Sequence, residues 1–501
     1  MQQFFCFSHI SATLILFSQA LALPHIPPRT NPKISWGNCT ASDPPNLQCG
    51  QIEVPVDYDN PRGDQFNVTF ARLQTLNATS RIGSLIFNPG GPGGAGSDVV
   101  FAQIQGAPFF SPELLAQYDV IGLDPRGTGL SNPIVCDPEI WNQRVSSTPK
   151  NEEEFNKLVE YNKAFSESCK AGTGPVFDFM GTTSAARDMD MVRRALQEDK
   201  LNFLGMSYGS NLGSTYAGLF PTKVGRMVLD GILAISDSDT SLLATESETY
   251  EATLNQFFKW CNTTSDCALS GQDAPGIFDN IIASANEKPI PAPGCTVGNV
   301  SVCRSDATGE EILSRVQLGL LIVEQSVLSA GWSGLSVAIA EAAQGNATLL
   351  SVPIKSAPSD SDFSFLGVAC KDWVPTSKSH IDLAFKRQMT NALSPHSRGS
   401  SQTYQAQSSC IGWASPPTPG QSLRPKQVAK LPKILLANSF WDPSTSIVWA
   451  NTLKQEVPSS VLVLRNGSGH TSYFGHGKIS KAMDTFLLTG ESPAQGTVFD
   501  S

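Results

Sequence analysis

Short apolar runs alternate with amphipathic stretches through the first half of the chain. Four of these runs predict strands, at residues 83–87, 118–124, 201–204 and 225–230. Residues 151–168 and 183–196 lie between them, and their apolar side chains recur every three or four positions, as on one face of a helix. Strands separated by helices predict a mostly parallel sheet with helices on both faces.

The same alternation returns near the end of the chain, after a long segment of different character. Strands are predicted at residues 433–437 and 461–464, and a closing helix at residues 478–488. The segment before them combines helical periodicity with loops rich in Pro, Ser and Gly. We therefore expect an α/β core in two parts, residues 23–235 and 426–501, with a large, mainly helical cap inserted at residues 236–425.

Composition narrows the class of protein. The chain has 501 residues, a formal net charge of −10 and 16% charged residues. This is an ordinary globular composition, and the length suits one large domain with an insertion or two domains. The acidic balance argues against nucleic acid or an anionic membrane as a partner. We expect a monomer.

The first residues predict a secretory signal peptide, residues 1–22. An apolar run at residues 12–17 precedes Ala20, Leu21 and Ala22, a small-residue cleavage signal. The run is short for a membrane anchor, which needs about 20 apolar residues. Removing the leader leaves ten of the eleven cysteines, spaced in neighbouring pairs that suit local disulfides. We therefore expect a secreted, extracellular protein.

Sequons for N-glycosylation fit the same compartment. They lie at Asn38, Asn67, Asn77, Asn262, Asn299, Asn346 and Asn466. A single sequon is common by chance, but seven of them together with a leader predict a glycoprotein.

A glycine-rich loop, NPGGPGGAGSD, follows the first predicted strand. Gly91, Gly93 and Gly96 fit G-x-G-x-x-G, the dinucleotide-binding pattern, which is a weak signal by itself. Nicotinamide cofactors are scarce outside cells, and Pro92 lacks the N–H that a phosphate cradle would use. The loop can instead offer one or two backbone N–H groups to an oxyanion that develops during a reaction.

A serine occupies the turn after the third predicted strand. The segment GMSYG, residues 205–209, fits G-x-S-x-G, in which glycines make room for a sharp turn that lifts the serine hydroxyl above the sheet. The pentapeptide can occur by chance, but here it has the required strand–turn–helix context. Ser207 is therefore the candidate nucleophile. The N–H groups of Tyr208 and Gly91, with Gly90 as the alternative to Gly91, are the candidate oxyanion donors.

A serine nucleophile needs a base and an orienting acid, and the chain order in this architecture is Ser, Asp or Glu, then His. Asp442 and His470 each follow one of the last two predicted strands, so we expect them to be the acid and the base. Asp372 in the cap and His476 near the closing helix are the alternatives. Neither His470 nor His476 has a carboxylate or cysteine at a metal-binding spacing, and we expect neither metal nor cofactor.

Several motifs occur in order along the chain. They are PGGPG at 89–93, DPRGTGLS at 124–131, TTSAARD at 182–188, GMSYG at 205–209, CKDW at 370–373, CIGW at 410–413, Asp442-Pro443 and Gly469-His470. Together they resemble the proline iminopeptidase and tripeptidyl aminopeptidase family of α/β-hydrolases, above all its secreted tripeptidyl-peptidase-like branch. The resemblance implies an α/β-hydrolase fold, the triad Ser207, Asp442 and His470, and a structural role for Asp124 and Arg126 in the floor of the site.

The resemblance also implies a peptide substrate with a free N-terminus. Such an enzyme should carry carboxylates that pair with the substrate ammonium group, and Glu246, Glu248 and Glu251 are candidates. The alternative for these three residues is a solvated helix face. A secreted ester or lactone hydrolase with the same triad is a second functional hypothesis. A non-catalytic binding protein on a hydrolase scaffold is a third, and the intact triad argues against it.

Overall fold

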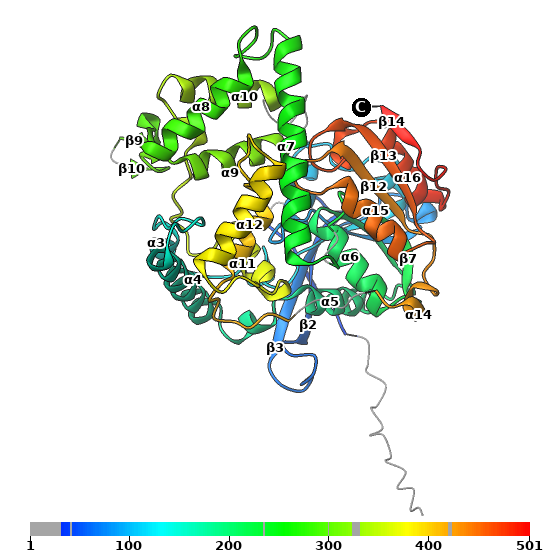
Figure 1. Ribbon diagram of the computed structural model, residues 1–501. Helices are drawn as coiled ribbons and strands as arrows, with labels where there is room; N and C mark the ends of the chain where they lie inside the picture. Colours follow the sequence, from blue (N-terminus) through cyan, green and yellow to red (C-terminus); the bar gives the residue numbers. More distant parts are fainter. Residues whose placement is uncertain are drawn as a thin grey trace, which may run out of the picture. The chain divides into compact units, whose positions relative to one another are not determined.

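The computed structural model describes residues 32–40, 43–233, 236–298, 300–322, 331–418 and 423–500. The predicted signal peptide, residues 1–22, and the sequon at Asn299 lie outside the described residues. Helices and strands are labelled in chain order (Figure 1).

The largest sheet in the described part of the chain has ten strands. In spatial order they are β1 (Ser35–Gly37), β2 (Leu47–Pro55), β3 (Gln65–Leu73), β5 (Tyr118–Leu123), β4 (Gly83–Asn88), β6 (Leu201–Met206), β7 (Val224–Asp230), β12 (Leu435–Trp441), β13 (Val461–Ser468) and β14 (Val498–Asp500). The pairs β1–β2, β2–β3 and β3–β5 are antiparallel, and all other neighbours are parallel. The prediction of a mostly parallel α/β sheet is confirmed.

The central strands contain continuous apolar runs because each face of the sheet is buried. In β4, Ile86 belongs to one hydrophobic core, whereas Leu85 and Phe87 belong to the other. In β6, Phe203 and Leu204 divide in the same way. Successive side chains of a strand point to opposite faces, so a strand covered on both sides needs a continuous apolar run.

Helices cover both faces of this sheet. The core that contains Ile86 also receives side chains from α5 (Thr182–Ala195), α6 (Tyr208–Leu219) and α15 (Ile447–Glu456). The opposite core receives side chains from α1 (Gly96–Ile104), α2 (Pro112–Gln117) and α16 (Lys478–Thr489). Two further helices, α3 (Pro138–Trp141) and α4 (Glu152–Thr173), precede α5 in the chain.

The segment between β7 and β12 is mainly helical. Its helices are α7 (Asp239–Thr263), α8 (Ala274–Glu287), α9 (Gly309–Leu320), α10 (Gly331–Ala343), α11 (Ser361–Asp372), α12 (His380–Leu393), α13 (Gln402–Ser409) and α14 (Pro425–Val428). Two small antiparallel pairs accompany them: β8 (Ile290–Pro291) with β11 (Asp306–Ala307), and β9 (Thr296–Val297) with β10 (Val300–Ser301).

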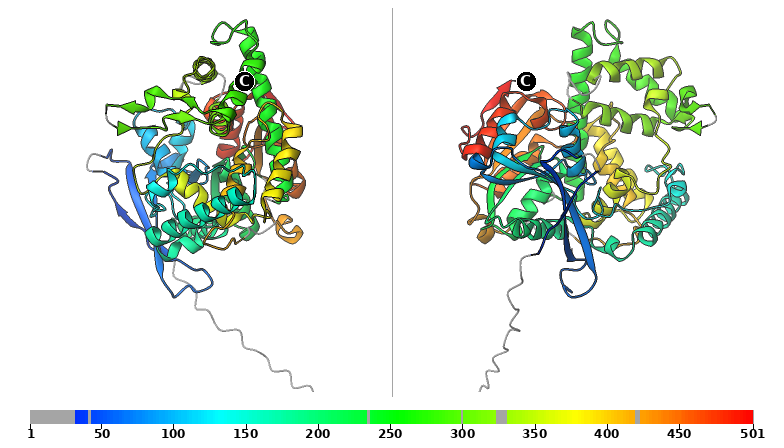
Figure 2. Two further views of the ribbon diagram at one scale, coloured as in Figure 1. Left: turned by 60° about the vertical axis from the view of Figure 1, so that its left-hand side comes forward. Right: turned by 180° about the vertical axis from the view of Figure 1, so that it is seen from behind.

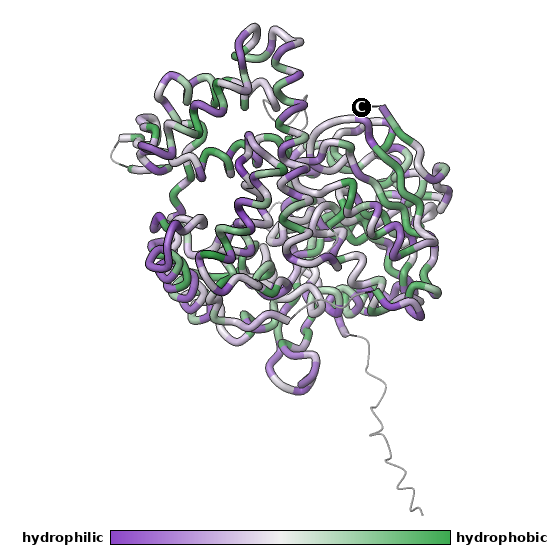
Figure 3. The backbone as a smooth tube through the Cα atoms, viewed as in Figure 1, coloured by the Kyte–Doolittle hydropathy of each residue, from purple (hydrophilic) through white to green (hydrophobic). Residues whose placement is uncertain are grey.

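Helices α7 to α10 enclose a hydrophobic core of their own, which includes Phe257, Phe278 and Trp332. Figures 1 and 2 show α8, α9 and α10 on the far side of α7 from β12 and β13. Hydrophilic and hydrophobic residues alternate along these helices, as expected when each buries one face (Figure 3). Helix α11 differs, because its Phe363 joins the core of the large sheet. The domain boundaries at residues 235 and 425 stay a prediction.

The observed elements differ from the predicted ones in two ways. The strand predicted at residues 433–437 is β12, which runs on to Trp441, so that Asp442 follows the strand directly. Sequence reasoning also missed the antiparallel strands β2 and β3. The signal was present, because in β2 the buried Ile52 and Val54 alternate with the exposed Gln51 and Glu53.

Ten cysteines form five disulfides, each between two cysteines that follow one another along the chain. The pairs are Cys39–Cys49, Cys136–Cys169, Cys261–Cys267, Cys295–Cys303 and Cys370–Cys410. Such a set is typical of proteins that fold in an oxidising compartment. Among the described residues, no helix combines the length and the apolar character needed to cross a membrane. Secretion itself stays a prediction.

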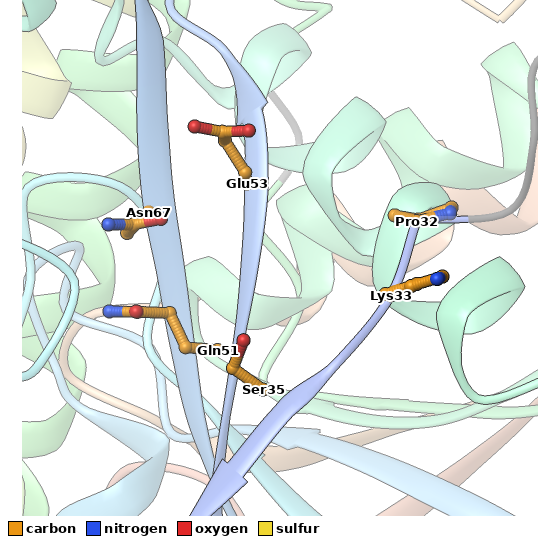
Figure 4. A pocket seen from close by; sticks show the side chains of 6 residues that line it. All are labelled: Pro32, Lys33, Ser35, Gln51, Glu53 and Asn67. Carbon is orange, nitrogen blue, oxygen red and sulfur yellow. The ribbon is translucent and has the colours of Figure 1, made fainter.

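The described sequons differ in accessibility. Asn38, Asn67, Asn77, Asn262 and Asn466 are exposed. Asn67 lines a pocket of about 400 Å³ together with Lys33, Gln51 and Glu53 (Figure 4). Asn346 is half-buried and its amide bonds to Glu341 and Thr348. Glycan occupancy stays a prediction at every sequon.

Arg126, in the motif DPRG, is the centre of a buried polar network that joins several segments of the chain. The Arg126 guanidinium is fully buried and donates two hydrogen bonds of 2.7 Å to the Asp188 carboxylate. It also donates to the carbonyl oxygens of Pro55, Val56 and Phe179. These contacts fit the structural role that the resemblance implied for Arg126.

Replacing Asp188 by alanine should lower the free energy of unfolding by about 3–5 kcal/mol, because the buried Arg126 charge loses its partner. Denaturant titration followed by circular dichroism measures the change. The control is Glu153→Ala, which removes an exposed ion pair with Lys157 and should leave the unfolding midpoint unchanged. Equal effects of the two substitutions would contradict the anchoring role of the buried pair.

Candidate active site

Ser207 sits on a strained turn between β6 and α6. Its backbone has φ 57° and ψ −125°, a conformation that non-glycine residues rarely adopt. The turn is closely packed, because a Cβ on Gly205 would lie 2.4 Å from the Gly209 carbonyl oxygen, and one on Gly209 would lie 2.8 Å from the Asn88 carbonyl oxygen. This explains why the motif needs both glycines.

The glycine-rich loop after β4 lies directly against this turn. A Cβ on Gly90 would lie 2.5 Å from the Met206 carbonyl oxygen and 2.7 Å from the Cβ of Ser207. Gly90 and Gly91 have φ of 102° and 107°, which favours glycine. Within the described part of the chain, the N–H groups of Gly91 and Tyr208 have no hydrogen-bond acceptor. Both are free to bind an oxyanion near Ser207.

The buried Asp442 carboxylate and the half-buried His470 imidazole form a pair. The Nδ1 atom of His470 lies 2.9 Å from each carboxylate oxygen of Asp442. The same carboxylate accepts hydrogen bonds from the backbone N–H groups of Ser444, Thr445 and Thr471 and from the Thr445 hydroxyl. Asp442 therefore has a fixed orientation, and its bond to Nδ1 leaves Nε2 of His470 available as a proton acceptor.

The pair perturbs both pKa values in directions that suit a charge-stabilised base. Burial disfavours the Asp442 carboxylate, but the His470 charge and the hydrogen bonds outweigh it and hold the pKa of Asp442 below its usual value. Burial likewise disfavours the imidazolium, but the Asp442 carboxylate raises the pKa of His470 above its usual value. Asp230 and Glu246 add to this increase.

Ser207 and His470 approach the same short stretch of backbone. The Ser207 N–H donates to the Asp230 carbonyl at 2.8 Å, and a Cβ on Gly231 would lie 3.5 Å from Cε1 of His470. The Ser207 hydroxyl has no hydrogen-bond partner among the described residues, so no bond to His470 is formed. Nucleophile–base contacts are commonly long when no substrate is bound and shorten in the reacting complex.

Sequence reasoning missed the residues that hold the His470 loop. The buried Arg465 guanidinium donates to the carbonyl oxygens of Ser468, Gly469 and Thr471 and to the hydroxyl of Ser472. The available signal was an arginine directly after the apolar run at residues 461–464, because a charge that is buried there needs internal acceptors.

The alternative acid and base lie elsewhere. The Asp372 carboxylate is buried and accepts from the N–H and the hydroxyl of Thr182, and that hydroxyl also contacts the hydroxyl of Tyr208. Asp372 thus supports the nucleophile helix and not a histidine. His476 is exposed, in the turn before α16.

The three candidate glutamates have different surroundings. Glu246 is 1% exposed, and its carboxylate accepts from the Gln317 amide at 2.9 Å and from the Thr403 N–H at 2.7 Å. Glu251 is buried and accepts from the N–H groups of residues 396 and 397. Glu248 is exposed, so the solvated-face alternative fits Glu248 alone.

The cap reaches the candidate site through Glu246 and α9. The Gln317 amide that bonds to Glu246 also donates to the Pro443 carbonyl at 3.0 Å, next to Asp442. The His470 N–H donates to the Leu321 carbonyl at the end of α9. Burial raises the pKa of Glu246 to about 7. Among the described residues, no three His, Cys, Asp or Glu side chains gather in a metal-binding cluster.

Two family models match the chain. A model described as alpha/beta hydrolase fold matches residues 83–274, and one described as TAP-like protein matches residues 396–499. The serine protease Hip1 of Mycobacterium tuberculosis is 26% identical over 494 residues, which cover 94% of this chain and 91% of the relative. The tripeptidyl aminopeptidase of Streptomyces lividans is 29% identical over 487 residues, covering 92% and 86%. Carboxylesterase B of Mycobacterium tuberculosis is 28% identical over 490 residues, covering 93% and 90%.

These matches and the strand–turn–helix geometry around Ser207 define the class: the chain has the α/β-hydrolase fold and is a serine hydrolase. Its C-terminal region, which contains Asp442 and His470, is TAP-like, as the resemblance to the tripeptidyl aminopeptidase family implied. The predictions of fold and of enzyme class are therefore confirmed. The individual roles of the site residues stay predictions.

Replacing Gly90 by alanine should lower kcat/KM at least about 100-fold, because the new Cβ would push the glycine-rich loop away from Ser207 and displace an oxyanion donor. Ester hydrolysis by the purified variant measures the loss. The matched control is Gly106→Ala, since Gly106 also has φ 102° but has no heavy atom within 4 Å of the added Cβ. Similar losses in both variants would point to backbone strain and not to the site.

The activity of the enzyme should fall as the pH drops through the raised pKa of His470, because only the neutral imidazole accepts a proton. The acid limb of kcat/KM should therefore have its midpoint above about 6.5, the usual histidine value. A pH–rate profile measures it. The exposed His476 serves as control, since His476→Gln should leave the profile unchanged. A midpoint below 6.5 would contradict the expected dominance of Asp442 over burial.

Proposed function

We propose that this serine hydrolase is an aminopeptidase in which Ser207, His470 and Asp442 form the catalytic triad. The observation that carries the proposal is the unpartnered Ser207 hydroxyl on a strained turn, beside the Asp442–His470 pair. The Ser207 oxygen attacks the carbonyl carbon of the substrate while Nε2 of His470 takes its proton. Asp442 holds the imidazole and stabilises the imidazolium.

The N–H groups of Gly91 and Tyr208 bind the oxyanion of the tetrahedral intermediate. The intermediate collapses when the C–N bond breaks and His470 transfers its proton to the leaving amine. Water then attacks the acyl-enzyme with His470 again acting as base, and the carboxylic acid product leaves with Ser207 restored. Losing one oxyanion donor costs about 10²–10³ in turnover in comparable enzymes.

A peptide substrate is supported by the relatives named tripeptidyl aminopeptidase and serine protease, which align with more than nine-tenths of the chain. For the substrate N-terminus, Glu246 is the candidate that lies nearest the acid loop, because its partner Gln317 also bonds to Pro443. Its carboxylate has only neutral donors among its hydrogen-bond partners. An ammonium group would add the missing positive charge, provided that Gln317 or the start of α13 moves to admit it.

A second candidate function is the hydrolysis of carboxylic esters with the same triad. The relative named carboxylesterase B, 28% identical over 93% of this chain, favours it. The chemistry of Ser207 is the same for both substrates, and only the need for a free substrate amino group separates them.

The purified mature protein should cleave a free tripeptide anilide faster than its N-acetylated form by at least about 100-fold, because acetylation removes the ammonium charge. A single-residue proline anilide and a p-nitrophenyl ester complete the panel, and Ser207→Ala should abolish every activity. Glu246→Gln should raise KM for the free tripeptide alone, whereas Glu248→Gln, on the exposed face of the same helix, should change nothing.

Fast ester cleavage with all anilides untouched would favour the esterase. Labelling of Ser207 by a fluorophosphonate tests the nucleophile independently of substrate choice. A protein that neither reacts with this probe nor loses activity in Ser207→Ala would contradict the proposed triad.

A further inference from the structure

Asp230 connects the nucleophile turn to the loop that carries His470. We propose that Asp230 is a positioning residue that fixes this loop and supplies a second negative charge to the imidazole. The proposal deepens the proposed function and rests on its assignment of Ser207 and His470. Asp442 alone would fill the acid role of a serine triad, so a second buried carboxylate at this point calls for a separate explanation.

The backbone contacts of Asp230 reach both sides of the site. Asp230 is the last residue of β7 and is fully buried. Its carbonyl oxygen accepts from the Ser207 N–H at 2.8 Å. Its Oδ2 atom accepts from the N–H groups of Ser472 and Tyr473 at 2.7 and 2.8 Å. Asp230 therefore contacts both the turn that carries Ser207 and the loop that carries His470.

The residue after Asp230 shows how close the imidazole lies. A Cβ on Gly231 would lie 2.9 Å from Cγ2 of Thr471, 3.0 Å from the Thr445 hydroxyl and 3.5 Å from Cε1 of His470. Gly231 also has φ 69°. The chain can pass between β7 and the base loop only as glycine, and the Asp230 carboxylate is held at that point.

The charge of Asp230 is only partly compensated. Its Oδ1 atom is buried and has no hydrogen-bond partner among the described residues. Burial raises the pKa of Asp230 to about 6. The hydrogen bonds from Ser472 and Tyr473 and the charge of Arg465 lower the pKa, but burial outweighs them. At neutral pH the carboxylate is therefore ionised, and its field favours the imidazolium of His470.

Four charged groups surround the imidazole from different elements. Asp442 follows β12, Asp230 ends β7 and Glu246 lies on α7, and all three favour its positive charge. The guanidinium of Arg465 on β13 offsets part of the charge of Asp230 and Asp442. Because the pKa of Glu246 is about 7, the charge of Glu246 changes within any titration that passes through neutral pH. The test is therefore made in a Glu246→Gln background.

Asp230→Asn separates the charge of Asp230 from its hydrogen bonds. The amide oxygen can still accept from Ser472 and Tyr473, and the amide nitrogen replaces the oxygen that has no partner. A purely structural residue would leave the pKa of His470 unchanged in this variant. If Asp230 acts as proposed, the pKa of His470 and the acid limb of the rate profile should fall by about one unit, and kcat should fall about 10-fold with KM little changed.

Two readouts follow His470 without a peptide substrate. Heteronuclear NMR of the imidazole, assigned with His470→Gln, gives its pKa directly. The pH dependence of fluorophosphonate labelling gives the pKa of the base that activates Ser207. An NMR shift in Asp230→Asn without any peptidase activity would support the inference while the aminopeptidase proposal fails. Peptidase activity with an unshifted His470 would overturn the inference alone.

The matched control is Asp124→Asn. Asp124 is also a buried carboxylate at the end of a strand, with its pKa raised by burial to about 6, and it accepts from the N–H groups of Ser97 and Leu130. Its substitution should lower stability without moving the His470 titration. An equal shift in both variants would overturn the proposal.

A second measurement leaves Asp230 in place, so it can be made even if the Asp230→Asn variant does not fold. In the Glu246→Gln protein, the NMR titration of His470 should show a second inflection near pH 6, where Asp230 itself titrates. A single inflection there would overturn the proposal.

Discussion

The candidate site depends on how closely backbone approaches backbone at the carboxyl ends of β4, β6 and β7. The nucleophile turn, the glycine-rich loop and the residue after β7 meet there with no room for a side chain at Gly90, Gly209 or Gly231. The strained φ of Ser207 persists because these neighbours pack closely against its backbone. A hydrophobic core on each face of the sheet holds these strands in register. The packing of the sheet therefore also sets the geometry of the site.

The charged side chains that act on His470 come from several different elements of the fold. Carboxylates of Asp442, Asp230 and Glu246 all raise its pKa, and the Arg465 guanidinium offsets part of the charge of Asp230 and Asp442. Burying a charge is costly unless it is paired or hydrogen-bonded, and here each carboxylate accepts hydrogen bonds from backbone N–H groups, with Asp442 and Asp230 sharing the loop that carries His470. The hydrogen bonds that offset the cost of burying these carboxylates therefore also position the loops.

The cap contacts the core in several places, among them Phe363, which packs against the large sheet, and Asp372, which accepts a hydrogen bond from Thr182. Helices α7 to α10 have a hydrophobic core of their own, and polar contacts through Gln317 and the Leu321 carbonyl reach the acid and base loops. A module with its own core can keep its fold while its position relative to the site changes. The candidate triad residues belong to the core, and the cap contributes Glu246 and Gln317 close to Asp442.

The sequence by itself determined the class of this protein. Apolar runs fixed the central strands because both faces of the sheet are buried, and the glycines around Ser207 marked a turn that admits no side chain. Chain order selected Asp442 and His470 because the carboxyl ends of parallel strands share one edge of a sheet. The strands β2 and β3 were missed, since their alternating pattern is shorter and less apolar.

Only the tertiary structure decided which other charges belong to the site. Asp230 ends a strand and Glu246 lies on a helix, and nothing in their local sequence separates them from Asp372 or Glu248. Their surroundings depend on which backbone and side-chain N–H groups, from segments more than 70 residues away, face them. Such long-range contacts are set by packing and not by local propensity, so the sequence named the candidate triad and the fold alone placed its surroundings.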